Sequence, residues 1–330
     1  MLNNKSILIT GGTGSFGKRI TKKILENYIP KKVIIFSRDE LKQSEMRNEK
    51  IYQKKNIRFF LGDVRDLQRL KTAFDGVDIV IHAAALKQVP AAEYNPGEYV
   101  KTNIQGAQNI IQAAVDCNVK KVVALSTDKA VNPINLYGAS KLVSDKLFVA
   151  ANNIVGGKKI SFSIVRYGNV SGSRGSVLPL FLNLKKSNKK LIITHKDATR
   201  FWISLDQGIQ FVFDCLKIMR GGEIFVPKIP AIRIIDLAKV IDPKQNYKII
   251  GLRPSEKLHE VLISPDESMD VVEFKKYYTI KPSFEFHARI NYFKAQNNEI
   301  GKKIKHGFKY SSDIKNNLLS LNKIKKLINI

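Results

Sequence analysis

Residues 125–141 read Leu-Ser-Thr-Asp-Lys-Ala-Val-Asn-Pro-Ile-Asn-Leu-Tyr-Gly-Ala-Ser-Lys and directly follow the apolar run 122–124. A short apolar run without polar alternation is typical of a strand that is buried on both faces, as in a parallel sheet. Pro133 interrupts the chain after that strand, and the apolar spacing from Tyr137 onward predicts a helix. The stretch therefore predicts a strand, a polar turn and a helix in succession.

Tyr137 and Lys141 are one helical turn apart, so their side chains project from the same face of the predicted helix. Tyrosine has a pKa near about 10 in water, but an ammonium group within about 4–6 Å favours the phenolate. A phenolate beside a substrate hydroxyl can take its proton while the carbon releases hydride. The alternative is a solvated surface pair, but the preceding strand end with Thr127, Asp128 and Lys129 favours a catalytic group.

A glycine-rich loop near the N-terminus follows a short apolar strand, residues 5–10, and precedes a helix that runs to Leu25. The glycines have the spacing Gly-x-x-Gly-x-x-Gly, which suits a tight turn, close approach to a pyrophosphate and close helix packing. A strand before such a loop and a helix after it are the context that this motif requires. We therefore predict that a dinucleotide binds at Gly11, Thr13, Gly14, Ser15, Phe16 and Gly17.

The end of the second predicted strand, residues 33–36, bears on which dinucleotide binds, because Ser37, Arg38 and Asp39 follow it. A carboxylate at this position holds an unmodified ribose, whereas an arginine next to a small residue accommodates a 2′-phosphate. Ser37 and Arg38 therefore favour NADP, and Asp39 keeps NAD as the alternative.

Two further strand ends are expected to reach the same cofactor, because ligands of such sheets lie beyond the carboxyl ends of the strands. Asp63 and Val64 follow the strand 57–61 and are expected near the adenine, although Asp63 alternatively caps the next helix. Small residues after the strand 78–81 let a ribose and a nicotinamide lie against the backbone. These residues are Ala83, Ala84 and Ala85.

Three further polar residues lie in or after that strand. Lys87 is expected to face the substrate. Asn103 lies in the predicted helix 98–114, where a buried amide either relays a proton through water to Lys141 or makes an ordinary packing contact. His82 is interpreted as a core histidine rather than a ligand.

Composition limits the class of protein. The 330 residues can bury a large core, and Cys117 and Cys215 lie in apolar contexts typical of free thiols in a reducing compartment. No spacing of Cys and His suggests a metal site. No apolar run approaches the roughly 18 residues needed to cross a bilayer, so a cytoplasmic protein without a membrane partner is expected.

The formal net charge of +27 would fit a nucleic acid or an anionic membrane as partner. The excess charge is spread along the chain, mostly as Lys, and the sequence lacks interleaved aromatic residues and nucleic-acid motifs. We therefore expect no nucleic-acid partner. The lysines are interpreted mainly as solvated surface, whose positive field helps to recruit a diphosphate.

The alternation of strands and helices in the first half of the chain predicts an α/β fold, a Rossmann-like doubly wound parallel sheet. The pattern then changes to short strands mixed with helices. We predict a dinucleotide-binding domain over residues 1–172 and a smaller C-terminal α/β substrate-binding lobe over residues 173–289, interleaved with the first. Residues 290–330 are predicted to form a basic tail with a short helix.

The second half of the chain carries isolated cations, notably Arg200 and the turn Arg253-Pro254-Ser255-Glu256-Lys257. An arginine beside a glutamate on a loop can grip a diphosphate and a ribose diol together. The alternative is an exposed ion pair, which contributes little to stability.

With these residues assembled, the chain resembles the extended short-chain dehydrogenase/reductase superfamily. Within it, the chain is similar to the configuration-inverting UDP-N-acetylglucosamine 4,6-dehydratases of pseudaminic acid biosynthesis, a pathway used in flagellin glycosylation. The resemblance runs from residue 7 to about residue 267, and its more specific stretches are residues 37–46, 125–141, 166–170 and 222–228. Two positions depart from the family pattern: Gln88 stands where His is usual, and Ser255 where Gly is usual.

The resemblance implies a reaction in three steps. Tyr137, activated by Lys141 and the cationic nicotinamide, takes the C4 hydroxyl proton while the C4 hydride passes to NADP, and Thr127 holds that oxygen. The resulting ketone acidifies the C5 hydrogen, and adjacent groups of opposite kind can remove it and help the C6 hydroxyl to leave. Lys129 is the candidate base and Asp128 the candidate acid, and hydride finally returns to C6.

The product implied by the resemblance is UDP-2-acetamido-2,6-dideoxy-beta-L-arabino-hex-4-ulose, with inversion at C5. Related retaining dehydratases of nucleoside-diphosphate glucose carry Glu where this chain has Lys129, which favours inversion. The residues implied to hold the UDP portion are Asn169, Arg200, Arg253 and Glu256. Family members form dimers or larger assemblies, so a homo-oligomer, a dimer or a hexamer, is expected.

A UDP-sugar C4 epimerase is the main alternative, because it shares the fold, the Tyr and Lys pair and the transient ketone. An epimerase has no need of the Asp128 and Lys129 pair. A protein that binds NADP without catalysis is a more remote alternative, and the intact Thr127, Tyr137 and Lys141 argue against it.

Overall fold

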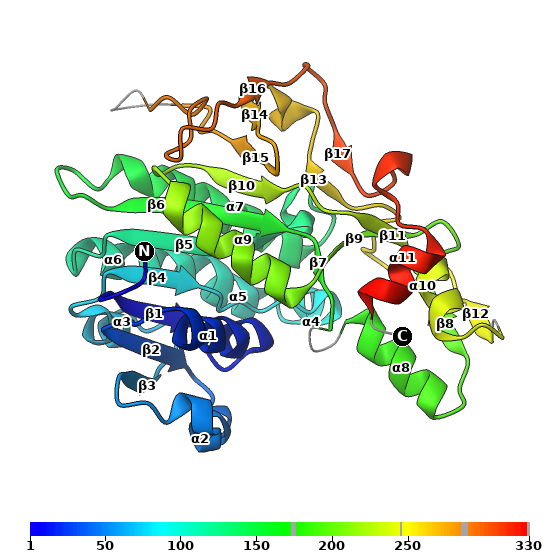
Figure 1. Ribbon diagram of the computed structural model, residues 1–330, viewed down its shortest axis with the longest axis horizontal. Coiled ribbons are helices and arrows are strands. Elements are labelled where there is room, and N and C mark those ends of the chain that lie inside the picture. Colours follow the sequence, from blue (N-terminus) through cyan, green and yellow to red (C-terminus); the bar gives the residue numbers. More distant parts are fainter. Residues whose placement is uncertain (173–175, 245, 285–289, 329–330) are drawn as a thin grey trace.

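The computed structural model describes residues 1–172, 176–244, 246–284 and 290–328 (Figure 1). These residues form two hydrophobic cores of unequal size. The larger core lies on both faces of a central sheet, and the smaller core lies among short strands and helices from the second half of the chain. The functional question is therefore what lies between these two cores.

A sheet of ten described strands forms the centre of the molecule (Figure 1). Its strands are β1 (Ser6–Thr10), β2 (Lys32–Ser37), β3 (Ile57–Leu61), β4 (Ile79–His82), β5 (Lys121–Thr127), β6 (Ser161–Tyr167), β10 (Ile224–Pro227), β14 (Val271–Glu273), β15 (Tyr277–Ile280) and β16 (Lys302–Lys303). Their order in space is β16-β14-β15-β10-β6-β5-β4-β1-β2-β3. The strands from β10 to β3 are parallel, and β14, β15 and β16 pair antiparallel at one edge.

Burial explains the apolar runs of the parallel strands. Every residue of β1 and β4 is buried, as are residues 122–124 of β5. Parallel strands are covered by helices on both faces, so polar alternation would leave polar side chains in the core. The predicted doubly wound parallel sheet is confirmed.

Helices cover the two faces of this sheet. They are α1 (Ser15–Asn27), α2 (Glu40–Asn48), α3 (Leu67–Phe74), α4 (Val89–Tyr94), α5 (Pro96–Tyr99), α6 (Gly106–Asp116), α7 (Leu136–Ala150) and α9 (Leu205–Ile218). On one face α1 packs against α9, and on the other α6 packs against both α3 and α7 (Figure 1). Short 3₁₀ turns occur at Lys50–Tyr52, Asp128–Ala130, Ala151–Asn153, Asp266–Asp270 and Lys315–Asn317.

The segment predicted as one helix over 98–114 is not regular. Its middle, Val100–Gln105, is a π-helical segment between α5 and α6. An inserted residue of this kind changes which side chains face inward, and such segments often occur at functional sites. Here it carries Asn103 toward the buried side.

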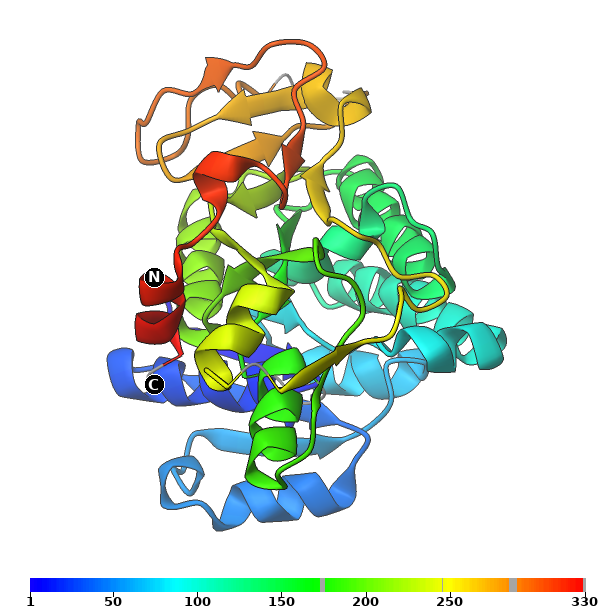
Figure 2. The same cartoon turned by 90° about the vertical axis from the view of Figure 1, so that its right-hand side faces the viewer.

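The smaller core is built from three groups of short elements (Figure 2). One is the sheet of β7 (Asn169–Val170), β9 (Thr199–Ile203) and β11 (Ala231–Arg233), and another is the parallel pair β8 (Leu191–Ile193) and β12 (Tyr247–Ile249). The helices are α8 (Val177–Lys186), α10 (Ile234–Ile241) and α11 (Leu321–Leu327). A further antiparallel pair, β13 (Val261–Ile263) with β17 (Tyr310–Ser311), joins β13 to the C-terminal segment.

The lobes are interleaved more deeply than a boundary at residue 172 describes. The chain leaves the large sheet after β6, builds β7 to β9, and returns through α9 to β10, which pairs with β6. Nor is the segment after residue 290 a separate tail, because β16 joins the large sheet and Ile324 is fully buried in the smaller core. Residues 329–330 lie outside the described residues.

Candidate active site

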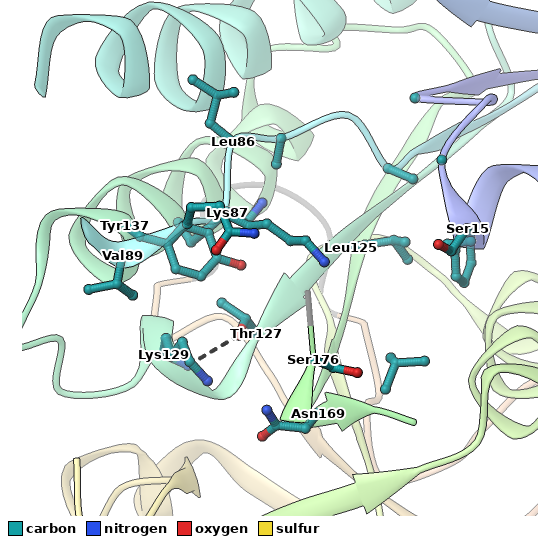
Figure 3. Close-up of a pocket in the computed structure, with 18 of the residues that line it drawn as sticks. Ser15, Leu86, Lys87, Val89, Leu125, Thr127, Lys129, Tyr137, Asn169 and Ser176 are labelled. Carbon is teal, nitrogen blue, oxygen red and sulfur yellow. Dashed lines mark hydrogen bonds between the residues drawn. The ribbon is translucent and has the colours of Figure 1, made fainter. Parts of the chain in front are cut away.

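A cleft of about 860 Å³ opens at the carboxyl ends of the parallel strands and extends to residues of the smaller lobe. Its lining includes every residue that the sequence suggested for cofactor, chemistry or substrate, with the exception of Asn103. Figure 3 shows Lys87, Thr127, Lys129 and Tyr137 gathered on one side of it. The topology therefore brings residues from distant parts of the chain to one place, as expected for ligands of doubly wound sheets.

The glycine-rich loop forms the floor of the cleft between β1 and α1. Gly11 has a φ of +64°, a conformation that favours glycine, and its carbonyl accepts a hydrogen bond of 2.9 Å from the Gly14 amide. A β-carbon at Gly17 would lie 2.5 Å from the Gly11 carbonyl oxygen, so α1 could not approach the loop with any other residue there. The start of α1 thus presents its free amide groups to the cleft, where a pyrophosphate is favoured.

The end of β2 brings both Arg38 and Asp39 to the lining of the cleft. The Asp39 carboxylate caps α2, accepting a hydrogen bond of 2.9 Å from the Lys42 amide, and it also pairs with the Lys42 ammonium. Ser37 Oγ lies 2.8 Å from Thr13 Oγ1. Arg38 is half exposed, with its guanidinium 3.6 Å from Asp63.

Asp63 lies beside Arg38 and does not cap the following helix, because Asp66 occupies that cap and accepts from the Arg69 amide at 2.9 Å. The alternative role of Asp63 is therefore wrong. Burial raises the pKa of the Asp63 carboxyl, but hydrogen bonds from Arg65 and the charge of Arg38 outweigh it and lower the pKa overall. Asp63 is thus held as a carboxylate at the cleft.

Asn103 is not among the residues that line the cleft. Its side chain accepts a hydrogen bond from the Leu86 amide at 2.9 Å and donates to the Leu86 carbonyl at 2.9 Å and to Ser140 Oγ at 3.0 Å. All of these partners are protein groups that need a buried polar neighbour. Asn103 therefore fixes the backbone next to Lys87 against α7, which is a positioning role rather than cofactor contact.

The start of α7 fixes Tyr137. Asn135 caps the helix by accepting from the Gly138 amide at 2.8 Å. Burial raises the pKa of Tyr137 to about 12, while the Lys129 charge and a hydrogen bond with Thr127 oppose the rise. Burial also lowers the pKa of Lys141, one turn further along, against the effect of the Asp145 carboxylate. In this structure, the chain alone therefore does not make Tyr137 a phenolate at neutral pH.

Thr127, Asp128 and Lys129 occupy the turn that ends β5. Asp128 is buried, and its Oδ1 accepts from Thr127 Oγ1 at 2.9 Å and from Lys129 Nζ at 3.0 Å. The Lys129 side chain remains 25% exposed and is thus the member of the pair that a ligand in the cleft can touch. Burial raises the pKa of the Asp128 carboxyl, and the Glu260 charge adds to that effect against the opposing Lys129 charge.

Glu260 is the site residue that the sequence did not suggest. It lies just before β13, lines the cleft, and its Oε1 is 3.1 Å from Lys129 Nζ. Arg200 Nε lies 3.7 Å from the same oxygen. The only sequence signal was a carboxylate placed directly before the apolar run 261–263, and many surface residues share that pattern.

Arg200 connects this cluster to the opposite end of the cleft. Its Nη2 donates to Glu256 Oε1 at 2.7 Å, and Glu256 also accepts from Thr194 at 3.1 Å. Ser255 has a φ of +61°, which is unusual for a residue other than glycine and matches its place where the family has Gly. Ser255 therefore holds in this turn a backbone conformation that glycine adopts more readily.

Several residues of the cleft lining have a buried polar side-chain atom with no hydrogen-bond partner among the described residues, and Asp128 Oδ2 and Glu260 Oε2 are among these atoms. Two others are Oδ1 of Asn169 and Oγ of Ser176, residues that Figure 3 labels. A buried polar atom without a partner is costly, so it usually awaits a ligand or water. Both residues line the cleft.

The described residues contain no cluster of three or more His, Cys, Asp or Glu side chains that could hold a metal ion. Among the same residues, no helix combines the length and the apolar character that a membrane crossing requires.

Comparison with known proteins gives a family match and two informative relatives. The family model described as polysaccharide biosynthesis protein matches residues 7–282. A Campylobacter jejuni subsp. jejuni serotype O:2 protein named UDP-N-acetylglucosamine 4,6-dehydratase (inverting) is 58% identical over 315 residues, covering 95% of this chain and 94% of that protein. A Rickettsia bellii protein named UDP-glucose 4-epimerase is 45% identical over 287 residues, covering 85% of this chain and 84% of that protein.

Solved structures share the fold. The X-ray structure of Pen from Bacillus thuringiensis aligns with a TM-score of 0.89 at 38% identity, covering 100% of this chain and 98% of that one. DesIV, a dTDP-glucose 4,6-dehydratase from Streptomyces venezuelae solved with NAD and TYD bound, aligns with a TM-score of 0.69 at 24% identity. That alignment covers 77% of this chain and 86% of DesIV.

The family match spans most of the chain, the two relatives exceed 40% identity over most of its length, and the cleft assembles the residues on which the resemblance rested. This chain therefore belongs to the polysaccharide biosynthesis protein family and, within the extended short-chain dehydrogenase/reductases, to the group of the inverting UDP-N-acetylglucosamine 4,6-dehydratases.

Proposed function

We propose that this protein is a UDP-N-acetylglucosamine 4,6-dehydratase that inverts C5, a lyase that uses NADP. The observation that carries the proposal is the Asp128 and Lys129 ion pair of 3.0 Å at the end of β5, in the same cleft as Thr127 and Tyr137. Oxidation at C4 needs Thr127 and Tyr137 together with Lys141, whereas loss of water needs an acid and a base as well. The relative at 58% identity carries the same function in its name.

The residues of the cleft fit a nicotinamide dinucleotide. Gly11 and Gly17 leave space that a β-carbon would fill, and the start of α1 offers amide groups to a pyrophosphate. When bound, such a cofactor accepts a hydride and later returns it. Arg38, with Ser37 beside it and Asp39 committed to capping α2, is the feature that favours the 2′-phosphate of NADP.

The chemistry at C4 belongs to Thr127, Tyr137 and Lys141. Tyr137 takes the hydroxyl proton, and Thr127 holds the oxygen. The pKa of about 12 that burial imposes on Tyr137 is too high for a base at neutral pH. The cationic ring of the oxidised cofactor would add a positive charge beside Lys141 and would lower this pKa, so proton removal is coupled to the presence of the oxidised cofactor.

The chemistry at C5 and C6 belongs to Asp128 and Lys129, which together take one proton from C5 and give one to the leaving C6 oxygen. Burial raises the pKa of Asp128, and the charges of Asp128 and Glu260 raise the pKa of Lys129, which is the member that reaches the cleft surface. Lys129 therefore acts as the base only after it has passed a proton to Asp128, and the two neighbouring groups then take opposite roles.

The UDP portion lies, in this proposal, at the smaller-lobe end of the cleft. Arg200 and Arg253 supply positive charge for the diphosphate, and Glu256 suits a ribose diol. Asn169 offers its unpartnered buried oxygen to the nucleotide. Lys87 lies beyond β4 at the sugar end of the cleft, where it contacts the substrate.

Proton NMR of the purified protein with UDP-N-acetylglucosamine and catalytic NADP in deuterium oxide tests the function. The expected result is a new methyl signal, deuterium at C5 and loss of the C4 proton, with coupling constants that report inversion. Tyr137→Phe is the matched control, which retains the ring and should abolish all three changes. Formation of the C4 epimer with the C5 and C6 protons retained would instead establish an epimerase, the activity named for the Rickettsia bellii relative.

Three further features complete the proposal and have independent readouts. The product feeds pseudaminic acid synthesis for flagellin glycosylation, so a deletion strain should lack that sugar on its flagellin. The protein is cytoplasmic, which cell fractionation tests. It forms a homo-oligomer, a dimer or a hexamer, and light scattering on the purified protein measures its size.

A further inference from the structure

Lys129 has two carboxylate neighbours, although the proposed elimination names only one of them. Its Nζ lies 3.0 Å from Asp128 Oδ1 and 3.1 Å from Glu260 Oε1. Both carboxylates are buried, with 1% of the Asp128 residue and 2% of the Glu260 residue exposed. The three groups come from two segments far apart in sequence, the turn after β5 and the residue before β13.

The two carboxylates differ in the positive charge around them. Glu260 has a second cation, since Arg200 Nε lies 3.7 Å from its Oε1, whereas among the described residues the Asp128 carboxylate hydrogen-bonds only to Lys129 and the Thr127 hydroxyl. Burial acts to raise the pKa of Glu260, but Lys129 and Arg200 outweigh it and lower the pKa. The pKa of Asp128 is raised, chiefly by burial. Of the two, Asp128 is therefore the carboxyl that exchanges a proton, and Glu260 stays ionised.

The charge of the cluster explains why a second carboxylate matters. With Lys129 as an ammonium and both carboxylates ionised, the three groups carry one net negative charge, and uptake of one proton by Asp128 makes them neutral. Without Glu260 the same uptake would leave a buried group with a net positive charge. Uncompensated buried charge is strongly unfavourable, so that uptake would be suppressed.

We propose that Glu260 is a positioning residue for the elimination: it is the fixed counter-ion of Lys129, which leaves Asp128 free to accept and return the proton. This inference rests on the proposed dehydratase function and deepens it. In this proposal Glu260 acts through Lys129, whose Nζ lies 3.1 Å from Glu260 Oε1.

The proton path balances. One proton of the Lys129 ammonium first passes over 3.0 Å to Asp128 Oδ1, and the lone pair freed on the nitrogen then takes the C5 proton while the C5–H electron pair forms the enolate of the C4 ketone. The C6 oxygen then takes a proton from Lys129 and leaves as water, while Asp128 returns its proton to Lys129. The electron pair of the enolate becomes the C5–C6 double bond, so the cluster ends in its starting charge state.

Other charged groups face this cluster and remain in place when Glu260 is changed. Arg200 projects from β9, Glu256 and Lys257 come from the turn before β13, and Tyr137 comes from α7. Lys257 donates to the Val131 carbonyl at 2.6 Å. Arg200 keeps its hydrogen bond of 2.7 Å to Glu256 when Glu260 is neutralised. The Arg200 guanidinium therefore still has a partner.

Glu260→Gln tests the proposal, because it removes the charge and keeps the shape. Single-turnover absorbance of the reduced cofactor reports C4 oxidation, and NMR in deuterium oxide reports C5 exchange and methyl formation. The expected result is oxidation within about threefold of wild type, with C5 exchange and methyl formation reduced about tenfold or more. The acidic limb of the kcat profile should also move to lower pH, because loss of the Glu260 charge lowers the pKa of Asp128.

Two further variants distinguish the proposal from a general structural effect. Glu45→Gln makes the same change on the exposed side of α2 and should leave all three readouts unchanged. Glu260→Asp keeps the charge and should recover part of the C5 exchange. This variant also tests the proposal if the Gln variant does not fold.

Specific outcomes would overturn the role of Glu260. They are equal loss of C4 oxidation and C5 exchange in Glu260→Gln, an acidic limb that stays in place or disappears, or no recovery in Glu260→Asp. Failure of the dehydratase proposal looks different, because the wild-type protein itself would then form no methyl signal.

Discussion

A methyl group added at Gly138 tests whether α7 must lie directly against the turn that carries Asp128 and Lys129. Gly138 is the third residue of α7 and follows Tyr137. A β-carbon there would overlap the Lys129 carbonyl oxygen and would lie 3.1 Å from the carbon of that carbonyl and 3.0 Å from Cβ of Pro133. Since carbon atoms in contact are usually about 3.5–4.0 Å apart, the start of α7 must move by roughly 0.5–1 Å.

The expected effect on stability is modest. Overpacking costs about 1–3 kcal/mol, while alanine is favoured over glycine inside a helix by about 0.8–1.0 kcal/mol. We therefore expect Gly138→Ala to lower the free energy of unfolding by about 0–2 kcal/mol. The effect on rate should be larger, because a displacement of about 1 Å of catalytic groups can cost about 100-fold.

Single-turnover reduction of the cofactor measures the rate, and urea unfolding measures the stability. Gly97→Ala is the matched control, because Gly97 also lies in a helix and a β-carbon there meets no atom within 4 Å. It should leave the rate unchanged. A Gly138→Ala protein that reduces the cofactor at the wild-type rate would show that close approach of α7 to this turn is not required.

Three further predictions follow from the geometry. Arg38→Ser should weaken NADP binding by about tenfold or more while leaving NAD binding nearly unchanged, since a charge-assisted contact contributes about 1.5–3 kcal/mol; equal losses in a fluorescence titration would argue against a 2′-phosphate site. His82 is buried, and burial together with the Lys141 charge lowers its pKa to about 3, so below about pH 6.5 only the unfolded chain takes up a proton there. The wild-type protein should therefore lose about 1.4 kcal/mol per pH unit below that value from this residue, and unfolding of His82→Gln at several pH values should show a correspondingly smaller slope. Asp145→Asn should lower the free energy of unfolding by about 1–3 kcal/mol, because Asp145 accepts from Ser126 Oγ at 2.6 Å and lies 3.7 Å from the buried Arg166, which keeps Glu267 at 2.8 Å as a partner; urea unfolding measures this, and an unchanged or higher stability would contradict it.

Much of the site was predictable because its signals are local. The apolar runs of β1 and β5, the glycine spacing after β1 and the separation of Tyr137 from Lys141 all act within one or two turns of chain. The rule that ligands lie beyond the carboxyl ends of parallel strands then places these separate motifs in one cleft. For these parts, neighbouring residues decide the geometry.

Asn103 shows where local signals stop. A polar residue in a helix can face a ligand or the backbone behind it, and the sequence is the same in both cases. The π-helical segment and the hydrogen bonds to Leu86 and Ser140 decide that it faces the backbone.

By itself, the sequence determined the strand and helix alternation, the glycine-rich loop and the candidate catalytic residues at the end of β5, because short-range periodicity and turn chemistry specify them. Only the tertiary structure decided that β10 returns to the large sheet, that the C-terminal segment packs on both lobes and that Glu260 contacts Lys129. These are pairings between distant segments, and their free energy comes from burial and charge compensation that no local pattern encodes.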